Sequence, residues 1–323
     1  MAHAGKAARP GSERALGRKL AGAAGWIVVV LGVLYASACA GFSVFGRNML
    51  YHPSTAVIAP DLAGVSAVRL RTKDGETLVA WWAPPQKGAP VFLFFDGNGG
   101  RPEIADSRWR RITENGAGFL AVYYRGYSGS TGQPTEIGLH EDARAGYDWL
   151  IAHGYRATDI IIHGYSLGTG VAVKLAAERP ARALVLEAPY TAIVDIAQLR
   201  APWAPLPLIM RDQFRSRDWI GKVHMPLLIA HGDRDAVIPF AQGERLYSLA
   251  NEPKQFVRMH GSEHATLVRD GVYDYVWAFL GEGPVTPSFH PSCTQASTQP
   301  RSPAAPTDAR TAPVACPKAQ AQP

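Results

Sequence analysis

Ser166 stands at the centre of the pentapeptide Gly164-Tyr165-Ser166-Leu167-Gly168, which matches the G-x-S-x-G nucleophile elbow. The apolar run 160–162 before it predicts a buried strand, and residues 168–177 after it predict a helix. So sharp a turn strains the backbone at Ser166 and pushes its side chain outward, and glycines on either side avoid a collision across the turn. The hydroxyl would then stand at a helix N-terminus, where N–H groups and the helix dipole favour an anion. The pattern predicts a nucleophilic serine.

A serine hydroxyl is a poor nucleophile at neutral pH, so it needs a base within hydrogen-bond reach and an acid that fixes the tautomer of that base. With this motif the acid follows the serine in the chain and precedes the histidine. Asp235, in the loop after a predicted strand at 227–230, is our candidate acid. Asp233 and Glu187 remain open, because nothing in the residue pattern excludes them.

The candidate base is His264, which lies in the loop after the last predicted strand, just before the closing helix. We prefer it to His260 because it lies further into that loop. His231 is expected to hold its turn by hydrogen bonds, and His163 is expected to pack inside the strand before the elbow. Both loops follow strands, so we expect them to converge on Ser166.

Acyl transfer builds negative charge on a carbonyl oxygen, which needs hydrogen-bond donors. In this kind of site one donor is the N–H of the residue after the nucleophile, here Leu167, and the other comes from the loop after the third strand. That loop is 96–100, where the glycines leave N–H groups free, and we take the N–H of Asn98 as the second donor.

Apolar runs of strand length alternate with helical stretches along residues 47–281, which predicts an α/β domain with a mostly parallel, doubly wound sheet. We expect strands at 65–71, 77–83, 91–95, 119–123, 160–162, 183–187, 227–230 and 255–259. We expect helices at 101–115, 135–153, 168–177, 240–250 and 266–280. Residues 191–220, rich in proline and tryptophan, predict a small cap over the strand ends, with a pair of connecting helices as the alternative.

The N-terminal residues predict a membrane anchor. Residues 1–20 are basic, and no charged residue occurs in 21–46, which is long enough to span a bilayer. The positive-inside rule keeps the N-terminus in the cytoplasm and exports the domain as a single-pass membrane protein. Cleavage after Ala38 and lipidation of Cys39 are the alternatives, and both also export the domain.

Composition excludes several other classes. The net charge is +6, but the basic residues are scattered, so we expect no nucleic-acid partner. Metal-binding, P-loop and C-x-x-C motifs are missing from the sequence, so we expect no cofactor and no metal. Only three cysteines occur, none in the predicted catalytic core. Residues 282–323 are rich in Pro, Ser and Ala and are expected to be disordered.

The stretches FFDGNGG, YYRGYSGSTGQPTE, GYSLG, LEAPYTAIVDIA, HGDRDAVIP and GSEHATL resemble membrane-anchored α/β-hydrolases of the bud-emergence-suppressor type, which are similar to prolyl-oligopeptidase catalytic domains. The similarity covers roughly residues 45–280 and implies an α/β-hydrolase fold. It implies Ser166, Asp235 and His264 as the triad, and so favours Asp235 over Asp233. The family usually has His-Gly-Asn where this chain has Asp96-Gly97-Asn98.

These observations predict an exported, membrane-tethered serine hydrolase that cleaves ester or thioester bonds of a small or lipid-like acyl substrate. The alternatives are a peptidase of the prolyl-oligopeptidase-like type and a non-catalytic scaffold with the same fold. The sequence leaves the substrate's chain length and the oligomeric state open.

Overall fold

The computed structural model describes residues 10–54, 56–99 and 106–281. Within them an eight-stranded sheet has the order β1-β2-β4-β3-β5-β6-β7-β8. Its strands are β1 (Ser66–Arg71), β2 (Thr77–Ala83), β3 (Val91–Phe95), β4 (Gly118–Val122), β5 (Ile160–Tyr165), β6 (Ala183–Glu187), β7 (Leu227–Gly232) and β8 (Lys254–Met259). β2 pairs antiparallel with both β1 and β4, and β3 to β8 are parallel to one another. The predicted fold class is confirmed.

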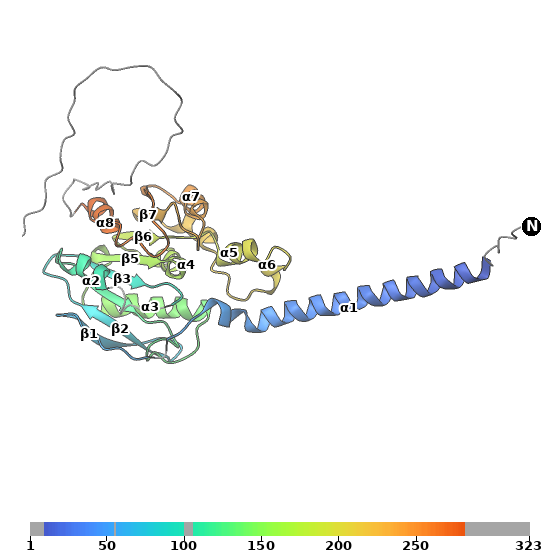
Figure 1. The fold of residues 1–323 in the computed structure, drawn as a ribbon. Coiled ribbons are helices and arrows are strands. Elements are labelled where there is room, and N and C mark those ends of the chain that lie inside the picture. The colour runs from blue at the N-terminus through green and yellow to red at the C-terminus, as the bar shows by residue number, and fades with distance from the viewer. Residues whose placement is uncertain (1–9, 55, 100–105, 282–323) are drawn as a thin grey trace, which may run out of the picture. The chain divides into compact units, whose positions relative to one another are not determined.

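Helices cover both faces of this sheet (Figure 1). α3 (Glu136–Ala152), α4 (Leu167–Ala176) and α7 (Phe240–Leu249) contribute to one buried cluster, and α2 (Asp106–Thr113) and α8 (Val272–Leu280) contribute to the other. Two further helices, α5 (Ile193–Arg200) and α6 (Leu206–Ile209), lie in the segment 191–220.

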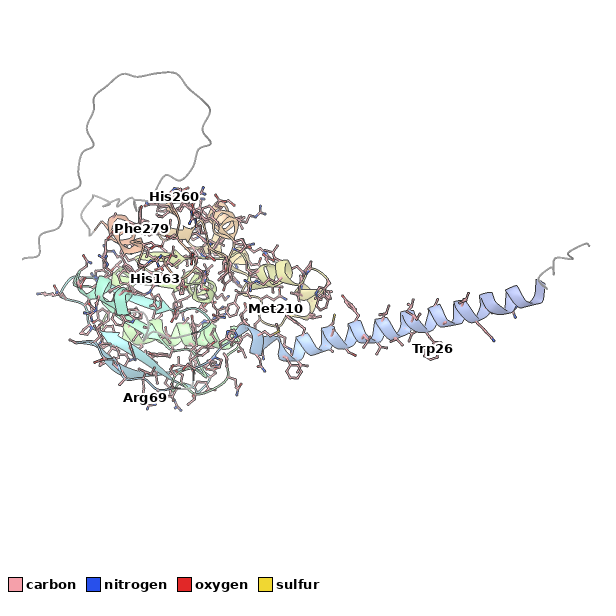
Figure 2. All side chains as sticks on the ribbon, in the orientation of Figure 1. Trp26, Arg69, His163, Met210, His260 and Phe279 are labelled. Carbon is pink, nitrogen blue, oxygen red and sulfur yellow. The ribbon has the colours of Figure 1, made fainter. Side chains whose placement is uncertain are left out.

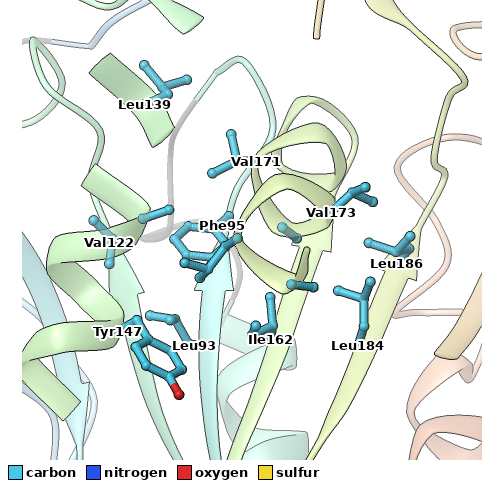
Figure 3. Packing of buried hydrophobic residues seen from close by; sticks show 14 of the residues in the cluster. Leu93, Phe95, Val122, Leu139, Tyr147, Ile162, Val171, Val173, Leu184 and Leu186 are labelled. Carbon is cyan, nitrogen blue, oxygen red and sulfur yellow. The ribbon is translucent and has the colours of Figure 1, made fainter. Parts of the chain in front are cut away.

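β3 illustrates why the sheet is buried on both sides. All five of its residues are apolar and buried. Because successive side chains point to opposite faces, Leu93 and Phe95 join the cluster under α3 and α4 (Figure 3), whereas Phe92 and Phe94 join the cluster under α2 and α8. A continuous apolar run of this length is therefore what a central parallel strand requires.

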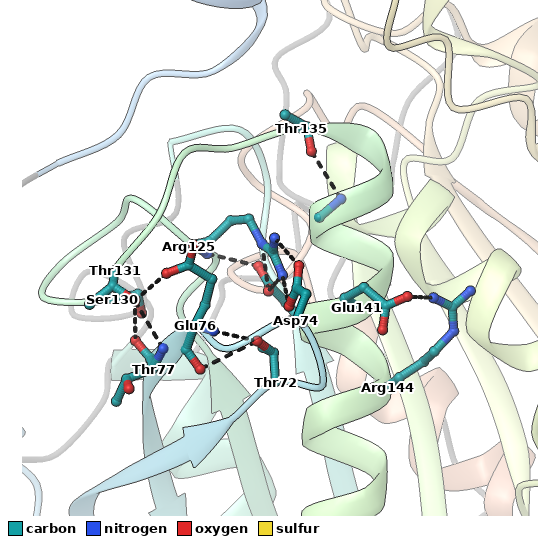
Figure 4. Close-up of polar contacts among 12 residues, drawn as sticks. Thr72, Asp74, Glu76, Thr77, Arg125, Ser130, Thr131, Thr135, Glu141 and Arg144 are labelled. Atoms are coloured by element: carbon teal, nitrogen blue, oxygen red, sulfur yellow. Dashed lines mark hydrogen bonds and ion pairs between the residues drawn. The ribbon is translucent and has the colours of Figure 1, made fainter.

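A buried arginine fixes the loop at 124–132 against the rest of the domain. Arg125 donates from its backbone N–H and its Nε to Asp142 in α3, at 2.8 and 2.9 Å, and from Nη1 to Asp74 in the β1–β2 turn, at 2.7 Å (Figure 4). The loop thereby becomes a rigid support for the residues that it contacts.

The closing helix is shorter than predicted. It begins at Val272 instead of Thr266, and residues 264–271 form turns. Gly271 precedes the helix with φ of 91°, a left-handed conformation that breaks helical geometry and that glycine adopts without strain. The first part of the helix predicted at 101–115 lies outside the described residues, and its remainder forms α2.

α1 (Pro10–Leu50) is one helix of 41 residues. Its part from Arg18 to Leu50 is long and apolar enough to cross a membrane, which is compatible with a single-pass anchor. Cys39 lies in this helix and is half-buried, while the other two cysteines and the tail 282–323 lie outside the described residues.

Candidate active site

Ser166 occupies the turn between β5 and α4 with φ of 52° and ψ of −120°, a conformation that a non-glycine residue seldom adopts. Backbone atoms packed around the turn explain why residues 164 and 168 are glycines. A Cβ atom on Gly168 would lie 2.1 Å from the carbonyl oxygen of Phe95, and one on Gly164 would lie 2.5 Å from the carbonyl oxygen of Gly168. Any side chain at these positions would therefore push the turn apart.

The structure brings Ser166, His264 and Asp235 into one hydrogen-bonded chain. His264 Nε2 lies 2.9 Å from Ser166 Oγ, and His264 Nδ1 lies 2.7 Å from Asp235 Oδ2. With the Nδ1–H donating to the carboxylate, Nε2 is left as an acceptor for the serine proton. This tautomer is the one that a general base requires.

Asp235 is held as an anion. Its side chain is buried, and its Oδ1 accepts the backbone N–H groups of Val237 and Ile238, both at 2.8 Å. Burial raises the pKa of this carboxyl, but hydrogen bonds from His231 and His264 and the Ile238 N–H outweigh burial and hold the pKa well below its usual range. The acid therefore stays charged at neutral pH.

The other two candidate acids have different partners. Asp233 accepts the N–H of Gly261 at 2.8 Å and lies 3.1 Å from His260 Nδ1, so this pair closes the turn after β8. Glu187 accepts from Arg108 and from His163. Neither carboxylate is hydrogen-bonded to His264.

The other three histidines considered in the sequence analysis lie away from the serine. His231 is buried, and its Nε2 lies 3.0 Å from the carbonyl oxygen of Ile238 and 3.3 Å from Asp235 Oδ2, so it braces the loop that carries the acid. His163 is fully buried in β5, whereas His260 is exposed at the edge of the domain (Figure 2).

The loop after β3 approaches the serine. A Cβ atom on Gly97 would lie 3.4 Å from Ser166 Cβ, in van der Waals contact, so the backbone of this loop passes directly beside the nucleophile. Tyr124 and Tyr127 support the loop from behind by donating to the carbonyl oxygens of Asp96 and Asn98, at 2.9 and 2.8 Å.

The backbone N–H groups of Leu167 and Asn98 are hydrogen-bonded to none of the described residues. The side chain of Asn98 points elsewhere, since its Nδ2 donates to the carbonyl oxygen of Leu50 at 3.2 Å. Asp96, which stands where the family usually has histidine, accepts the Gly97 N–H on its own Oδ1 at 2.7 Å. This contact shows that Asp96 orders its own loop.

A pocket of about 320 Å³ opens above Ser166. One wall is the loop 96–99, and another is the turn 264–269, which the sequence predicted as helix from residue 266 onward. Apolar contributions come from Tyr165, Leu267 and Val268. Among the described residues that line the pocket, none belongs to 191–220.

A buried ion pair that the sequence reasoning missed forms the floor. Arg108 Nη2 donates to Glu187 Oε2 at 2.9 Å, and both side chains line the pocket while almost wholly withdrawn from water. Its guanidinium also donates to Tyr273 Oη, at 3.2 Å. The sequence contained one signal of this buried position. Arg108 lies four residues before the apolar Ile112, and because positions i and i+4 share one face of a helix, Arg108 lies on the face that packs inward.

Replacing Arg108 by methionine is expected to lower the free energy of unfolding by about 3–5 kcal/mol, because it leaves the Glu187 charge buried without its partner. The double variant Arg108→Met/Glu187→Gln removes both charges, keeps an acceptor for His163, and should recover most of the loss. Urea unfolding followed by circular dichroism measures both variants. A double variant less stable than the single one would contradict this assignment.

Glu187 also predicts a pH dependence of stability. Burial raises its pKa, but the charge of Arg108 and the hydrogen bond from His163 prevail and lower it from 4.5 to about 2. A group whose folded pKa is depressed stabilises the fold above its unfolded pKa and loses that contribution as the pH falls toward its folded pKa. Between pH 4.5 and 2 the wild type should therefore lose stability more steeply than Arg108→Met/Glu187→Gln in pH-dependent unfolding. If the stability of the two proteins falls equally with pH over this range, the lowered pKa of Glu187 is contradicted.

Comparison with known proteins identifies the relatives of this chain. It is 35% identical over 226 residues to an uncharacterized protein of Mycobacterium tuberculosis, which covers 68% of this chain and 80% of that protein. It is 29% identical to Protein bem46 of Schizosaccharomyces pombe, over 68% of this chain and 77% of that protein. It is 31% identical to the lysophosphatidylserine lipase ABHD12 of Xenopus tropicalis, over 64% of this chain and 61% of that protein. No protein-family model matches the chain.

Solved structures agree on the fold. An esterase of Pyrococcus furiosus superposes with a TM-score of 0.57 at 17% identity, covering 72% of this chain and 98% of that chain. An α/β-hydrolase of a Penicillium species superposes with a TM-score of 0.53 at 18% identity, covering 69% of this chain and 99% of that chain. From these relatives and from its own architecture, the chain belongs to the α/β-hydrolase family and is similar to Protein bem46.

Proposed function

We propose that this protein is a serine hydrolase that cleaves ester or thioester bonds of a small or lipid-like acyl substrate. The observation that carries the proposal is the continuous hydrogen-bonded chain from Ser166 Oγ through His264 to the buried, charged Asp235. Esterases and a lipase among the relatives and structural neighbours support the same reaction class.

In the proposed reaction, Ser166 Oγ attacks the acyl carbonyl carbon while His264 Nε2 takes the hydroxyl proton. Asp235 holds the imidazole in position and stabilises the imidazolium that forms. The N–H groups of Leu167 and Asn98 donate to the oxyanion. His264 then gives the proton to the leaving alkoxide or thiolate, and a water molecule, activated by the same histidine, releases the acid from the acyl-enzyme.

Three observations support an apolar acyl group. The pocket has the side chains of Leu267, Val268 and Tyr165 on its walls. One relative is named as a lysophosphatidylserine lipase. The apolar helix α1 would hold the domain at a lipid surface, where such substrates are found.

The proposal is tested by hydrolysis of p-nitrophenyl esters of increasing acyl length, with acyl thioesters and peptide p-nitroanilides beside them. We expect turnover of esters and thioesters, with a preference among chain lengths, and little turnover of anilides. A preference for anilides would instead favour a peptidase.

We also propose that α1 is an uncleaved anchor with its basic end in the cytoplasm and the domain exported. The five basic residues before residue 21, against Arg47 alone soon after residue 46, support this orientation. A phosphatase fused after residue 281 is expected to be active in cells. If the phosphatase fusion is inactive and a cytoplasmic reporter fused at the same position is active, the orientation is the reverse of the proposed one.

A further inference from the structure

A ten-residue segment, Ala201–Met210, combines features that a water-exposed loop does not need. It contains the whole connection between α5 and α6 and the short helix α6 itself, and it holds no charged residue, although Arg200 and Arg211 stand immediately on either side. Leu206 packs inward, but two other large side chains are turned outward: Leu208 is 85% exposed and Trp203 is 60% exposed. Leu199, just before the segment, is 63% exposed.

The segment touches the apolar helix α1. Tyr35 Oη donates to the carbonyl oxygen of Trp203 at 3.2 Å, and the two rings meet edge to face with their centroids 6.4 Å apart. Further along α1, Arg47 makes a two-point ion pair with Asp212, with Nε 2.7 Å from Oδ2. Contacts at Tyr35 and Arg47 hold the segment alongside α1 over about 18 Å, because a helix rises about 1.5 Å per residue.

The position of Tyr35 sets the depth of this contact. The hydrocarbon core of a bilayer needs about 20 helical residues, and every window of that length inside the uncharged run 21–46 contains Tyr35. Wherever the bilayer lies along α1, the residue that contacts Trp203 therefore lies within the apolar layer.

Most of the backbone N–H groups of the segment are satisfied without water. Pro202, Pro205 and Pro207 have no N–H to hydrate. Of the seven other residues between 201 and 210, five donate their N–H to a carbonyl within the segment or α5; they are Ala201, Ala204, Leu206, Leu208 and Met210.

Most of the carbonyl oxygens have partners as well. The side chain of Gln198 donates to the carbonyl oxygens of Ala201 and Ala204, and that of Gln213 donates to those of Pro207 and Met210. Irregular backbone enters a membrane only when its polar groups are paired in this way.

We propose that Ala201–Met210 inserts into the leaflet of the bilayer next to the domain, beside the α1 helix that spans it. Trp203 and Leu208 enter the lipid, and the flanking Arg200 and Arg211 remain at the level of the phosphates. Arg211 reaches the charged headgroups, and Arg200 also donates from Nη2 to the carbonyl oxygen of Val237 at 3.2 Å. The domain is thereby held against the membrane at a second point and cannot swing freely on α1. The proposal rests on α1 as the membrane span and does not depend on the proposed hydrolysis.

The test uses the full chain with its three cysteines replaced, reconstituted in phosphatidylcholine–phosphatidylglycerol vesicles. Single cysteines at Leu208, at Val30 in α1, and at Ile151 are each labelled with the environment-sensitive fluorophore NBD. Ile151 is the matched control, because it is an exposed apolar residue at the far end of α3. Circular dichroism melts check that each labelled protein is folded.

We expect NBD at 208 to emit at shorter wavelength than NBD at 151 and to lose most of its fluorescence when doxyl-labelled lipids are included, as NBD at 30 does. NBD at 151 should be unaffected. If position 30 is quenched and position 208 behaves like position 151, the segment lies in water and the proposal is wrong. If neither 30 nor 208 is quenched, α1 does not span the bilayer and the proposal also fails.

Discussion

Replacing Ser166 by alanine is expected to lower kcat for ester hydrolysis by about 10⁶-fold, because the nucleophile of a triad acts with its base as one unit. The hydroxyl at Ser166 is the group that His264 Nε2 reaches at 2.9 Å, and no other described hydroxyl is hydrogen-bonded to that nitrogen. Initial rates with the best p-nitrophenyl ester, at saturating substrate, measure the loss.

Ser107 provides a matched control because it also lines the pocket. Ser107→Ala should leave kcat close to that of the wild type. Retained activity in Ser166→Ala, or an equal loss in both variants, would mean that the reaction runs through another group.

Replacing Asp235 by asparagine is expected to lower kcat by about 10⁴-fold while the fold survives. Asparagine can still accept the N–H groups of Val237 and Ile238 through its carbonyl oxygen. Its amide nitrogen then faces His264 Nδ1, which favours the tautomer with the proton on Nε2, and the histidine can no longer take the proton of Ser166. kcat and the thermal melt of the variant measure activity and fold separately.

Asp233→Asn is the control for this change, since Asp233 lies two residues away and contacts Gly261 and His260 instead of His264. We expect it to lose far less activity than Asp235→Asn. Equal losses from the two substitutions would show that the acid of the site has been misassigned within this loop.

The sequence predicted most strands of the sheet because their apolar runs are continuous and bounded by turn residues, as at 91–95 and 183–187. It also identified the elbow, whose two glycines are required by close backbone contacts. The residues alone did not separate Asp233 from Asp235, because both follow β7. That choice depends on which carboxylate the β7–β8 pairing brings opposite His264, and Gly232 pairs with Met259 only in the folded sheet.

Other parts of the site depend on contacts that local pattern does not encode. The Arg108–Glu187 pair joins residues 79 apart in sequence. The turn 264–271 has helix-forming residues, but Gly271 in a left-handed conformation ends it and leaves the turn as a pocket wall. The contact of Trp203 with Tyr35 spans 168 positions of sequence, so the place of 201–210 beside α1 could not be read from composition.

The most direct measurement is covalent labelling of the full chain with a fluorophosphonate, followed by mass spectrometry of the modified peptide. A fluorophosphonate reacts much faster with a serine that a base activates than with other hydroxyls, so it reports the nucleophile whatever the natural acyl substrate is. We expect one label on Ser166 of the wild type, none on Ser166→Ala, and much slower labelling of Asp235→Asn. A wild-type protein that stays unlabelled across pH and detergent, or one that is labelled at another residue, would contradict it.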